Sequence, residues 1–172
     1  MPRPFTEPRL VIASHNKGKI TEIADLLAPY PVDIISIREF DLPEPEETGR
    51  TYIANAVIKA EAAVAGCGLP CLADDSGVSV EALCGEPGIF SARWAGPDRD
   101  FNLAMTTVNE KLGKNPNRRA CFVSVLTLAW PDGHSESFEG RVYGNITWPP
   151  RGSCGFGYDP MFMPDGYDKT FG

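Results

Sequence analysis

Strand-like and helix-like patterns alternate through the first part of the chain. The apolar run Arg9–Ser14 has the length of a buried strand. Apolar residues then recur with helical spacing over 17–28, where Pro29 is expected to end the helix. A second strand pattern covers 32–37 and a second helical pattern covers 51–66. This order restricts the chain to folds in which helices pack on a sheet.

Each of the two predicted helices carries one apolar face. In the first helix this face comprises Ile20, Ile23, Ala24 and Leu27. In the second we expect it to comprise Ile53, Ala56, Val57, Ala60 and Val64, with Asn55 and Lys59 together on another face.

The middle of the chain combines a short apolar strand with an acidic segment. The strand covers 70–73 and is expected to end directly on Asp74-Asp75-Ser76-Gly77. A further strand pattern at 78–83 and a helical pattern at 98–112 follow.

A long hairpin is predicted after the last helix. Strand patterns at 120–130 and 135–148 flank Pro131-Asp132-Gly133, and Asp-Gly between two such runs is a hairpin signal. A glycine-rich segment at 152–157 and a last strand pattern at 158–163 complete the chain. Alternating elements followed by a hairpin indicate a mixed α/β domain.

Composition limits the classes of function. The 172 residues, 42% of them apolar, suit a single domain with its own core. No apolar run approaches the roughly 20 residues of a membrane helix, and no signal-peptide pattern is visible, so we expect a cytoplasmic protein with no membrane partner. The net charge of −7 disfavours nucleic acid as a partner. Five scattered cysteines and two histidines argue against a zinc site and favour free thiols.

The junction between the first strand and the first helix has the composition of a phosphate-binding loop. Its residues are Ser14, His15, Asn16, Lys17, Gly18 and Lys19. Unpaired N–H groups and the positive dipole end attract anions to a helix N-terminus, and lysines strengthen this attraction. The segment is not a P-loop, because Ile20 follows Gly18-Lys19 and the first glycine is missing. A helix cap formed by Asn or Ser, with solvated lysines, is the structural alternative.

The adjacent carboxylates Asp74 and Asp75 are the second candidate feature. Their predicted place at a strand end is where α/β folds bind ligands. Carboxylate oxygens suit Mg²⁺, which bridges to substrate phosphates, and a carboxylate can deprotonate an attacking water. The alternative is a plain turn, for which Asp-Ser-Gly is well suited.

Two further segments carry weaker signals. In the acidic loop 44–49, Glu46 or Glu47 could complete a metal site with Asp75, while Lys59 could meet a phosphate. A solvated acidic loop is the alternative. In the segment 155–160, an aromatic ring can stack on a base and a carboxylate can accept a base N–H. A glycine-rich turn with core aromatics is the alternative there.

Together these segments resemble the inosine/xanthosine triphosphate pyrophosphatases, a family also described as dITP/XTP or non-standard purine NTP pyrophosphatases. The similarity runs in order from about residue 9 to the last residue. It rests on Ser14, Asn16 and Lys19, then Glu46-Glu47-Thr48-Gly49, Asn55-Ala56 with Lys59-Ala60, Ala73-Asp74-Asp75-Ser76-Gly77, Pro87-Gly88-Ile89-Phe90-Ser91-Ala92-Arg93, and Gly155-Phe156-Gly157-Tyr158-Asp159-Pro160.

The resemblance implies both a fold and a reaction. The fold is α/β, with an elongated mixed β-sheet, flanking helices and two lobes around a central active-site cleft, in a homodimer. The reaction is hydrolysis of ITP, dITP or XTP to the monophosphate and pyrophosphate, which cleanses the nucleotide pool. The cofactor is Mg²⁺, with Mn²⁺ as an alternative.

The resemblance also implies roles for single residues. Asp75 is the metal ligand and general base, and either Glu46 or Glu47 is the second acidic ligand. The triphosphate is held by Lys59 and by Ser14, His15, Asn16, Lys17, Gly18 and Lys19. Asp74 and Ser76 contact substrate, and the base pocket is lined by Phe156, Gly157, Tyr158 and Asp159.

One departure from the family concerns the C-terminal end. The family carries a Ser-His-Arg motif whose His and Arg contact the base, whereas this chain stops at Gly172 before such a motif. We therefore expect one pyrophosphatase domain over residues 1–172 that lacks its C-terminal segment. The alternatives are a nucleotide pyrophosphatase for other modified bases, a non-catalytic nucleotide-binding protein, and a phospho-acceptor receiver domain, which the long hairpin disfavours.

Overall fold

The computed structural model describes residues 2–172, which form one six-stranded mixed sheet and three α-helices. The strands are β1 (Arg9–Ile12), β2 (Asp33–Ser36), β3 (Cys71–Val80), β4 (Arg119–Ala129), β5 (Ser135–Ile146) and β6 (Phe162–Pro164). The helices are α1 (Lys17–Leu27), α2 (Tyr52–Cys67) and α3 (Phe101–Leu112). The strands follow the order β2-β1-β3-β4-β5-β6 in the sheet, which confirms the predicted mixed α/β class.

The chain forms two compact units. The first comprises residues up to Asp75 together with Val125–Glu139, and the second comprises Ser76–Ser124 and Gly140–Gly172. Strands β3, β4 and β5 each continue from one unit into the other, and each unit has its own apolar core. The single domain expected over residues 1–172 stays a prediction.

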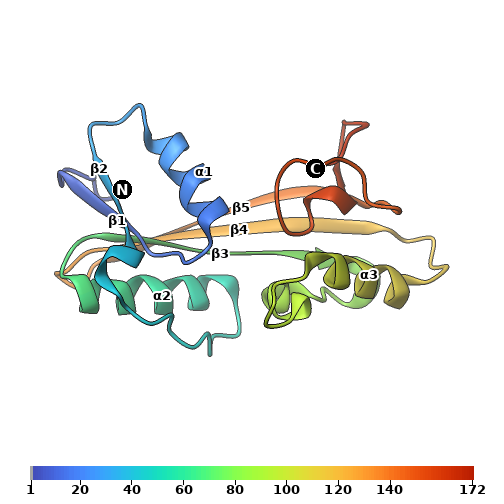
Figure 1. The fold of residues 1–172 in the computed structure, drawn as a ribbon, viewed down its shortest axis with the longest axis horizontal. Helices are drawn as coiled ribbons and strands as arrows, with labels where there is room; N and C mark the ends of the chain where they lie inside the picture. Colours follow the sequence, from blue (N-terminus) through green and yellow to red (C-terminus); the bar gives the residue numbers. More distant parts are fainter. Residues whose placement is uncertain (1) are drawn as a thin grey trace. The chain divides into compact units, whose positions relative to one another are not determined.

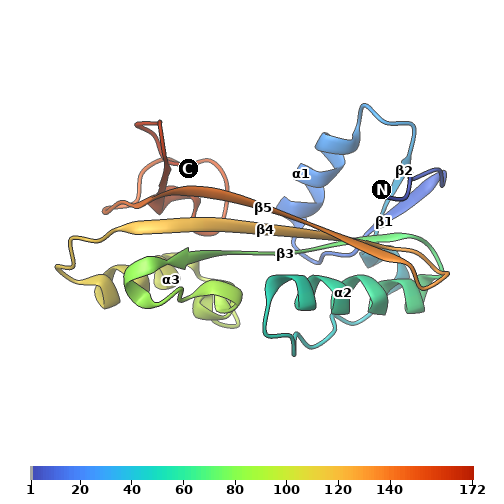
Figure 2. The ribbon, with the colours of Figure 1, turned by 180° about the vertical axis from the view of Figure 1, so that it is seen from behind.

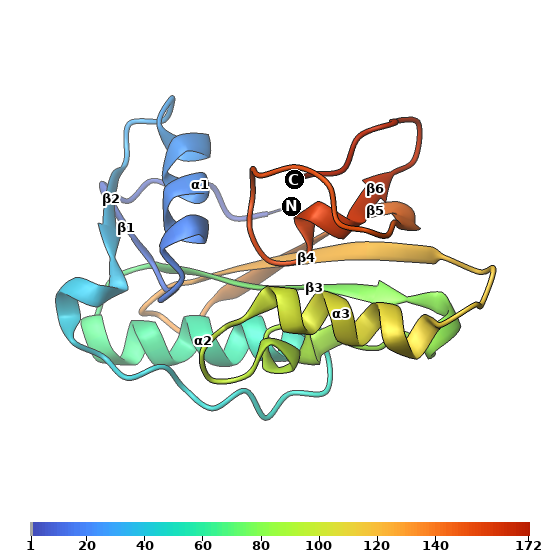
Figure 3. The ribbon, with the colours of Figure 1, turned by 45° about the vertical axis from the view of Figure 1, so that its right-hand side comes forward.

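In the first unit, β1 lies between β2 and β3 and is parallel to both. It pairs with β2 over all four of its residues and with β3 through Val11 and Ile12. Figures 1 and 3 show α1 and α2 on opposite sides of β3. The buried core of this unit includes Val11, Ala13, Ile37, Ala60, Ala63, Cys71, Ala73 and Ala129.

The two helices of the first unit begin and end within one residue of their predicted bounds. The apolar face predicted for α2 is wrong in part, because Ile53 is 43% exposed whereas Asn55 is fully buried. The physical reason is a contact with another segment of the chain, which helical periodicity cannot predict. Asn55 faces the turn at Gly49, whose backbone N–H it binds.

The largest difference from the sequence prediction concerns β3. The strand runs unbroken from Cys71 to Val80, so the segments expected at 70–73 and 78–83 are one strand, and Asp74 and Asp75 lie inside it instead of at its end. The reason is tertiary, because β3 lies between β1 and β4, and its pairing with β4 overrides the local turn preference. Lysines on two helices neutralise the two carboxylates. Pairing with β1 stops where Ala13 donates to the Leu72 carbonyl at 2.8 Å. The two aspartates therefore lie just beyond the carboxyl end of β1.

The predicted hairpin is confirmed. Strands β4 and β5 are neighbours in the sheet (Figure 2), and the backbone N–H of Trp130 donates to the His134 carbonyl at 2.9 Å across the turn. Helix α3 begins three residues later than predicted, because the Asp100 side chain caps it by accepting from the backbone N–H groups of Asn102 and Leu103.

The second unit places α3 on one side of β3 and the C-terminal segment on the other (Figures 1 and 2). The last strand is shorter and later than predicted, since 159–161 form a 3₁₀ turn before β6. Its core includes Val78, Val80, Met105, Val108, Tyr158, Met161 and Phe162. Within residues 2–172, no helix is both long and apolar enough to cross a membrane.

Candidate active site

The turn from β1 into α1 is built by a helix cap. Asn16 is the N-cap, and its Oδ1 accepts from the backbone N–H groups of Gly18 at 2.9 Å and Lys19 at 3.4 Å. The Ser14 hydroxyl, which is nearly buried, accepts from the Asn16 N–H at 3.2 Å. The structural alternative, an Asn cap, is thus present. The cap also fixes the helix N-terminus, whose first turn contains no acidic residue and so keeps its positive potential.

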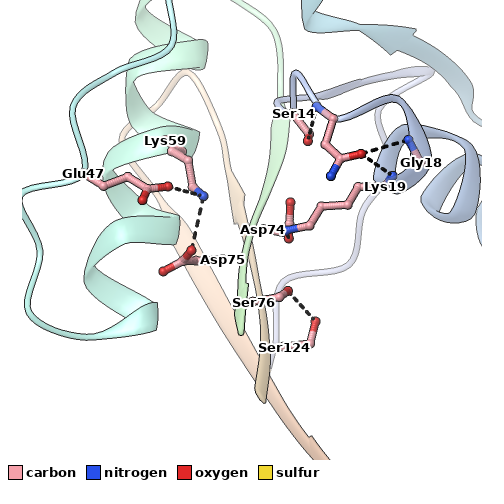
Figure 4. Close-up of polar contacts among 10 residues, drawn as sticks. Ser14, Gly18, Lys19, Glu47, Lys59, Asp74, Asp75, Ser76 and Ser124 are labelled. Atoms are coloured by element: carbon pink, nitrogen blue, oxygen red, sulfur yellow. Dashed lines mark hydrogen bonds and ion pairs between the residues drawn. The ribbon is translucent and has the colours of Figure 1, made fainter. Parts of the chain in front are cut away.

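Asp74 and Asp75 point in opposite directions because successive side chains on a strand alternate between its two faces. Asp74 forms an ion pair with Lys19 of α1, and only 6% of its side chain is exposed. Asp75 pairs instead with Lys59 of α2. Figure 4 shows the two pairs on the two sides of β3. The acidic pair is therefore shared between two helices and is not a single carboxylate cluster.

Lys59 lies between two carboxylates. Its Nζ donates to Glu47 Oε1 at 2.8 Å and lies 3.5 Å from Asp75 Oδ1, and only 11% of the lysine side chain is exposed (Figure 4). These three residues come from the loop before α2, from α2 itself and from β3. A buried cation thus holds together two acids that the sequence places 28 residues apart.

The ionisation of this group reflects burial opposed by charge. Burial raises the pKa of Asp75, Lys59 lowers it and Glu47 raises it, so that the pKa lies above the ordinary value for an aspartate. For Lys59, burial lowers the pKa, but Asp75, Glu47 and Asp74 together outweigh it, and the pKa lies above its usual range. Lys19 also lowers the pKa of Asp75. These mutual effects across β3 make the five groups one electrostatic unit.

Asn55 is a polar residue of the site whose burial the sequence pattern did not indicate. It lies one turn before Lys59 on α2, is fully buried, and accepts from the Gly49 N–H at 2.8 Å through Oδ1. A Cβ at Gly49 would lie only 2.5 Å from that Oδ1, so this close approach requires glycine. The contact fixes the end of the loop that carries Glu47. Helical spacing predicted that Asn55 and Lys59 share a face of this helix, but not that Asn55 is buried.

The carboxylates fit a divalent cation in their donor chemistry. Asp75 Oδ2 and Asn55 Nδ2 are both buried and neither makes a hydrogen bond of normal length among residues 2–172, yet Asn55 lies close enough to lower the pKa of Asp75. Glu47 turns inward to Lys59, whereas Glu46 is exposed, so Glu47 is the acid that the structure brings to Asp75. No group of three or more His, Cys, Asp or Glu side chains suited to a metal occurs in the described part of the chain. Such a two-carboxylate site suits Mg²⁺, which takes its other ligands from water and phosphate.

His15 and Lys17 lie beside this group without joining it. His15 Nε2 lies 3.2 Å from the Leu42 carbonyl oxygen, and the ring lines a small pocket with Leu42, Pro43, Pro45 and Lys59. Lys17 is the exposed first residue of α1.

The remaining predicted residues lie in the second unit. The Ser76 hydroxyl donates to the Ser124 hydroxyl at 3.3 Å. Asp159 Oδ2 accepts from the Phe156 N–H at 2.7 Å and so closes a turn, and burial raises the pKa of Asp159 above its usual value. Tyr158 packs in the core with its hydroxyl donating to the Ser91 carbonyl at 2.8 Å, whereas Phe156 is half-buried.

The sequence is similar to one family of known proteins along nearly its whole length. A sequence profile of the Ham1 family matches residues 10–172. A relative from Bradyrhizobium sp. (strain BTAi1) named dITP/XTP pyrophosphatase is 58% identical over 95% of this chain and 79% of its own length. A relative of the same name from Rhodospirillum centenum is 57% identical over 99% of this chain and 85% of its own length.

Solved structures from the same family are similar to this chain in both fold and sequence. The Ham1 protein of Staphylococcus aureus is 41% identical with a TM-score of 0.84, covering 95% of this chain and 84% of its own. A Ham1 protein from Coxiella burnetii is 37% identical with a TM-score of 0.87, covering 96% of this chain and 86% of its own. A nucleoside-triphosphatase, dITP/XTP pyrophosphatase, from Mycobacterium abscessus is 40% identical with a TM-score of 0.78, covering 95% of this chain and 87% of its own.

Proposed function

This chain belongs to the Ham1 family, and we propose that it hydrolyses the non-standard purine nucleoside triphosphates dITP, XTP and ITP to the monophosphate and pyrophosphate. The observation that carries the proposal is the lysine held between two acids. Lys59 joins Glu47 and Asp75, while Lys19 joins Asp74 beside the capped N-terminus of α1. The names of the relatives supply the substrate class.

The cationic groups bind the triphosphate in this proposal. The positive end of the α1 dipole and the ammonium groups of Lys19 and Lys59 would bind the charged phosphates. Both lysines are held by carboxylates in the structure, so their positions are set before substrate arrives. The negative charge that develops on the departing pyrophosphate would be stabilised by the same groups.

The acidic groups would hold the metal ion and activate the attacking water. Asp75 and Glu47 would hold Mg²⁺ or Mn²⁺, which would neutralise phosphate charge and assist the deprotonation of water. Asp75 would orient a water and accept its proton, because its carboxylate lies beside Lys59, where the triphosphate would bind. The water attacks the α-phosphorus, the α–β bridge bond breaks, and pyrophosphate leaves. No covalent nucleophile takes part.

Base selection belongs to the second unit in this proposal. Phe156 would stack on the base, with the tight turn at Gly157 allowing close approach. Hydrogen bonds to a 6-keto purine that adenine's amino group cannot match would give the preference. Two lobes around a central cleft, a homodimer and a cytoplasmic location belong to the proposal as expectations from the family resemblance.

A nucleotide panel tests the proposal. With Mg²⁺, the protein should release pyrophosphate and not orthophosphate from dITP, ITP and XTP, with little release from dATP or dGTP. Asp75→Asn should lose turnover while keeping the far-UV circular dichroism of the parent, and Asp98→Asn, an exposed acid in the second unit, should keep full activity. Release of orthophosphate, or binding of dITP without any hydrolysis, would contradict the proposal. The second outcome would favour a non-catalytic nucleotide-binding protein.

A further inference from the structure

The thiols of Cys67 and Cys71 lie in contact in the first unit. Their Sγ atoms are 3.4 Å apart. Cys67 is the last residue of α2 and Cys71 is the first residue of β3. Both thiols also lie near the Leu69 carbonyl, at 3.8 Å for Cys67 and 3.3 Å for Cys71. The pair therefore spans the turn that connects the two elements.

The shape of this turn brings the two side chains together. Gly68 is the helix C-cap in the left-handed conformation, with φ of 69°, and it reverses the chain after a single residue. Pro70 then leads into the strand. A disulfide has an S–S distance of about 2.05 Å, so the two sulfurs must approach by little more than one further ångström.

We propose that Cys67 and Cys71 form a thiol–disulfide exchange site, which low-molecular-weight disulfides of the glutathione type oxidise to an intramolecular disulfide. First the Cys67 thiolate attacks one sulfur of the small disulfide, whose S–S bond breaks and releases one small thiolate. The Cys71 thiolate then attacks the Cys67 sulfur, and the mixed disulfide breaks to release the second small thiolate. The two protons of the cysteines pass to the two released thiolates. Two protein thiols are oxidised, and one small disulfide is reduced to two thiols.

The burial of the two thiols sets this order. Cys67 is half-buried and can be reached from solvent, whereas Cys71 is fully buried. Because Cys71 is fully buried, a reagent in solution cannot reach its thiol, whose pKa is also raised by burial and by the contact to Cys67. Its neighbour's sulfur is nevertheless within reach. The disulfide would join the end of α2, which carries Lys59, to the start of β3, which carries Asp75.

Two other cysteines provide internal controls. Cys84 and Cys154 are both exposed. With a small disulfide, solitary exposed thiols should stop at the mixed-disulfide stage. The same chain therefore shows an intramolecular disulfide at one site and mixed disulfides at two others under identical conditions. No nucleotide is present, so the result is independent of the proposed function.

Peptide mapping after oxidation tests the proposal. The native protein is treated with oxidised glutathione, alkylated, and cleaved with trypsin and with a protease that cuts before aspartate. Cleavage at Lys59 and before Asp74 isolates residues 60–73, which contain Cys67 and Cys71 and no other cysteine. This peptide should be unalkylated, free of glutathione, and lighter than its dithiol form by two hydrogen atoms. Cys84 and Cys154 should carry glutathione.

Single-cysteine variants test whether Cys67 reacts first and Cys71 then displaces the glutathione. Cys71→Ser should accumulate glutathione on Cys67, and Cys67→Ser should leave Cys71 alkylatable under denaturing conditions. Cys84→Ser should oxidise at residues 60–73 as the parent does. If Cys71→Ser fails to fold, Cys67→Ser still provides the test, because its change lies at a half-buried thiol. Alkylated or glutathionylated Cys67 in the native chain, or a disulfide between two chains, would overturn the proposal.

Discussion

Replacement of Lys59 by glutamine should lower both stability and activity. The change removes the cation between Glu47 and Asp75 and leaves two buried or half-buried acids facing each other. Lys59 Nζ lies 2.8 Å from one carboxylate and 3.5 Å from the other. At an effective dielectric constant of about 20, these distances correspond to attractions of about 6 and about 5 kcal/mol.

The net loss is smaller than these attractions. Desolvation of the buried charges offsets several kcal/mol per ion, and removing one partner of a buried pair typically costs about 3–5 kcal/mol. We take the lower end, about 3 kcal/mol, because Glu47 is 23% exposed and can regain water. For a domain of this size, about 2–4 °C is lost per kcal/mol, so the melting temperature should fall by about 6–12 °C.

Differential scanning calorimetry without metal measures this loss. Lys114→Gln, a change of the same chemistry at an exposed position, should leave the melting temperature within about 1 °C of the parent. Addition of Mg²⁺ should raise the melting temperature of Lys59→Gln more than that of the parent, since a cation would again lie between the acids. Turnover of dITP should fall about a hundredfold or more. An unchanged melting temperature, or equal effects of Mg²⁺ on both proteins, would refute the reasoning.

Three further predictions concern Asp75, Asn16 and Gly49 of the candidate site. Asp75→Asn should abolish turnover yet raise stability at neutral pH. Because burial lifts the folded-state pKa of Asp75 above its unfolded value, its favourable contribution is complete below the unfolded pKa and is lost as pH rises through the folded pKa. Urea unfolding should therefore show the variant's advantage at pH 8 shrinking as pH falls towards 4, and a constant advantage would contradict this. Asn16→Ala removes the cap of α1 and should cost about 1 kcal/mol in urea unfolding and raise KM for dITP, whereas Asn16→Asp should keep the cap. Gly49→Ala places a Cβ 2.5 Å from Asn55 Oδ1 and should cost about 1–3 kcal/mol and reduce kcat through Glu47. An activity equal to that of Gly140→Ala, where the nearest atom lies 4.0 Å away, would show that the Gly49 contact does not position the loop.

Local sequence signals predicted the elements of the fold well. Apolar periodicity located α1 and α2 to within one residue, and Asp-Gly located the hairpin turn. The Asn16 cap was visible as a local alternative, because a cap needs only residues two or three positions away. The residues of the candidate site were gathered by their order along the chain and their resemblance to one family. Each of these signals depends either on residues close together in the chain or on the order of motifs along it, so the sequence contains all of them.

The tertiary structure decided how those residues are used. Whether Asp74 and Asp75 end a strand or continue it depends on the neighbouring strand β4. Their ion pairs depend on Lys19 and Lys59, which approach them from opposite faces of β3. The orientation of Glu47 depends on Lys59, twelve residues away on another element. The burial of Asn55 depends on the turn at Gly49. Composition and periodicity contain none of these pairings, because each is made by the close approach of separate elements once the sheet and helices have packed.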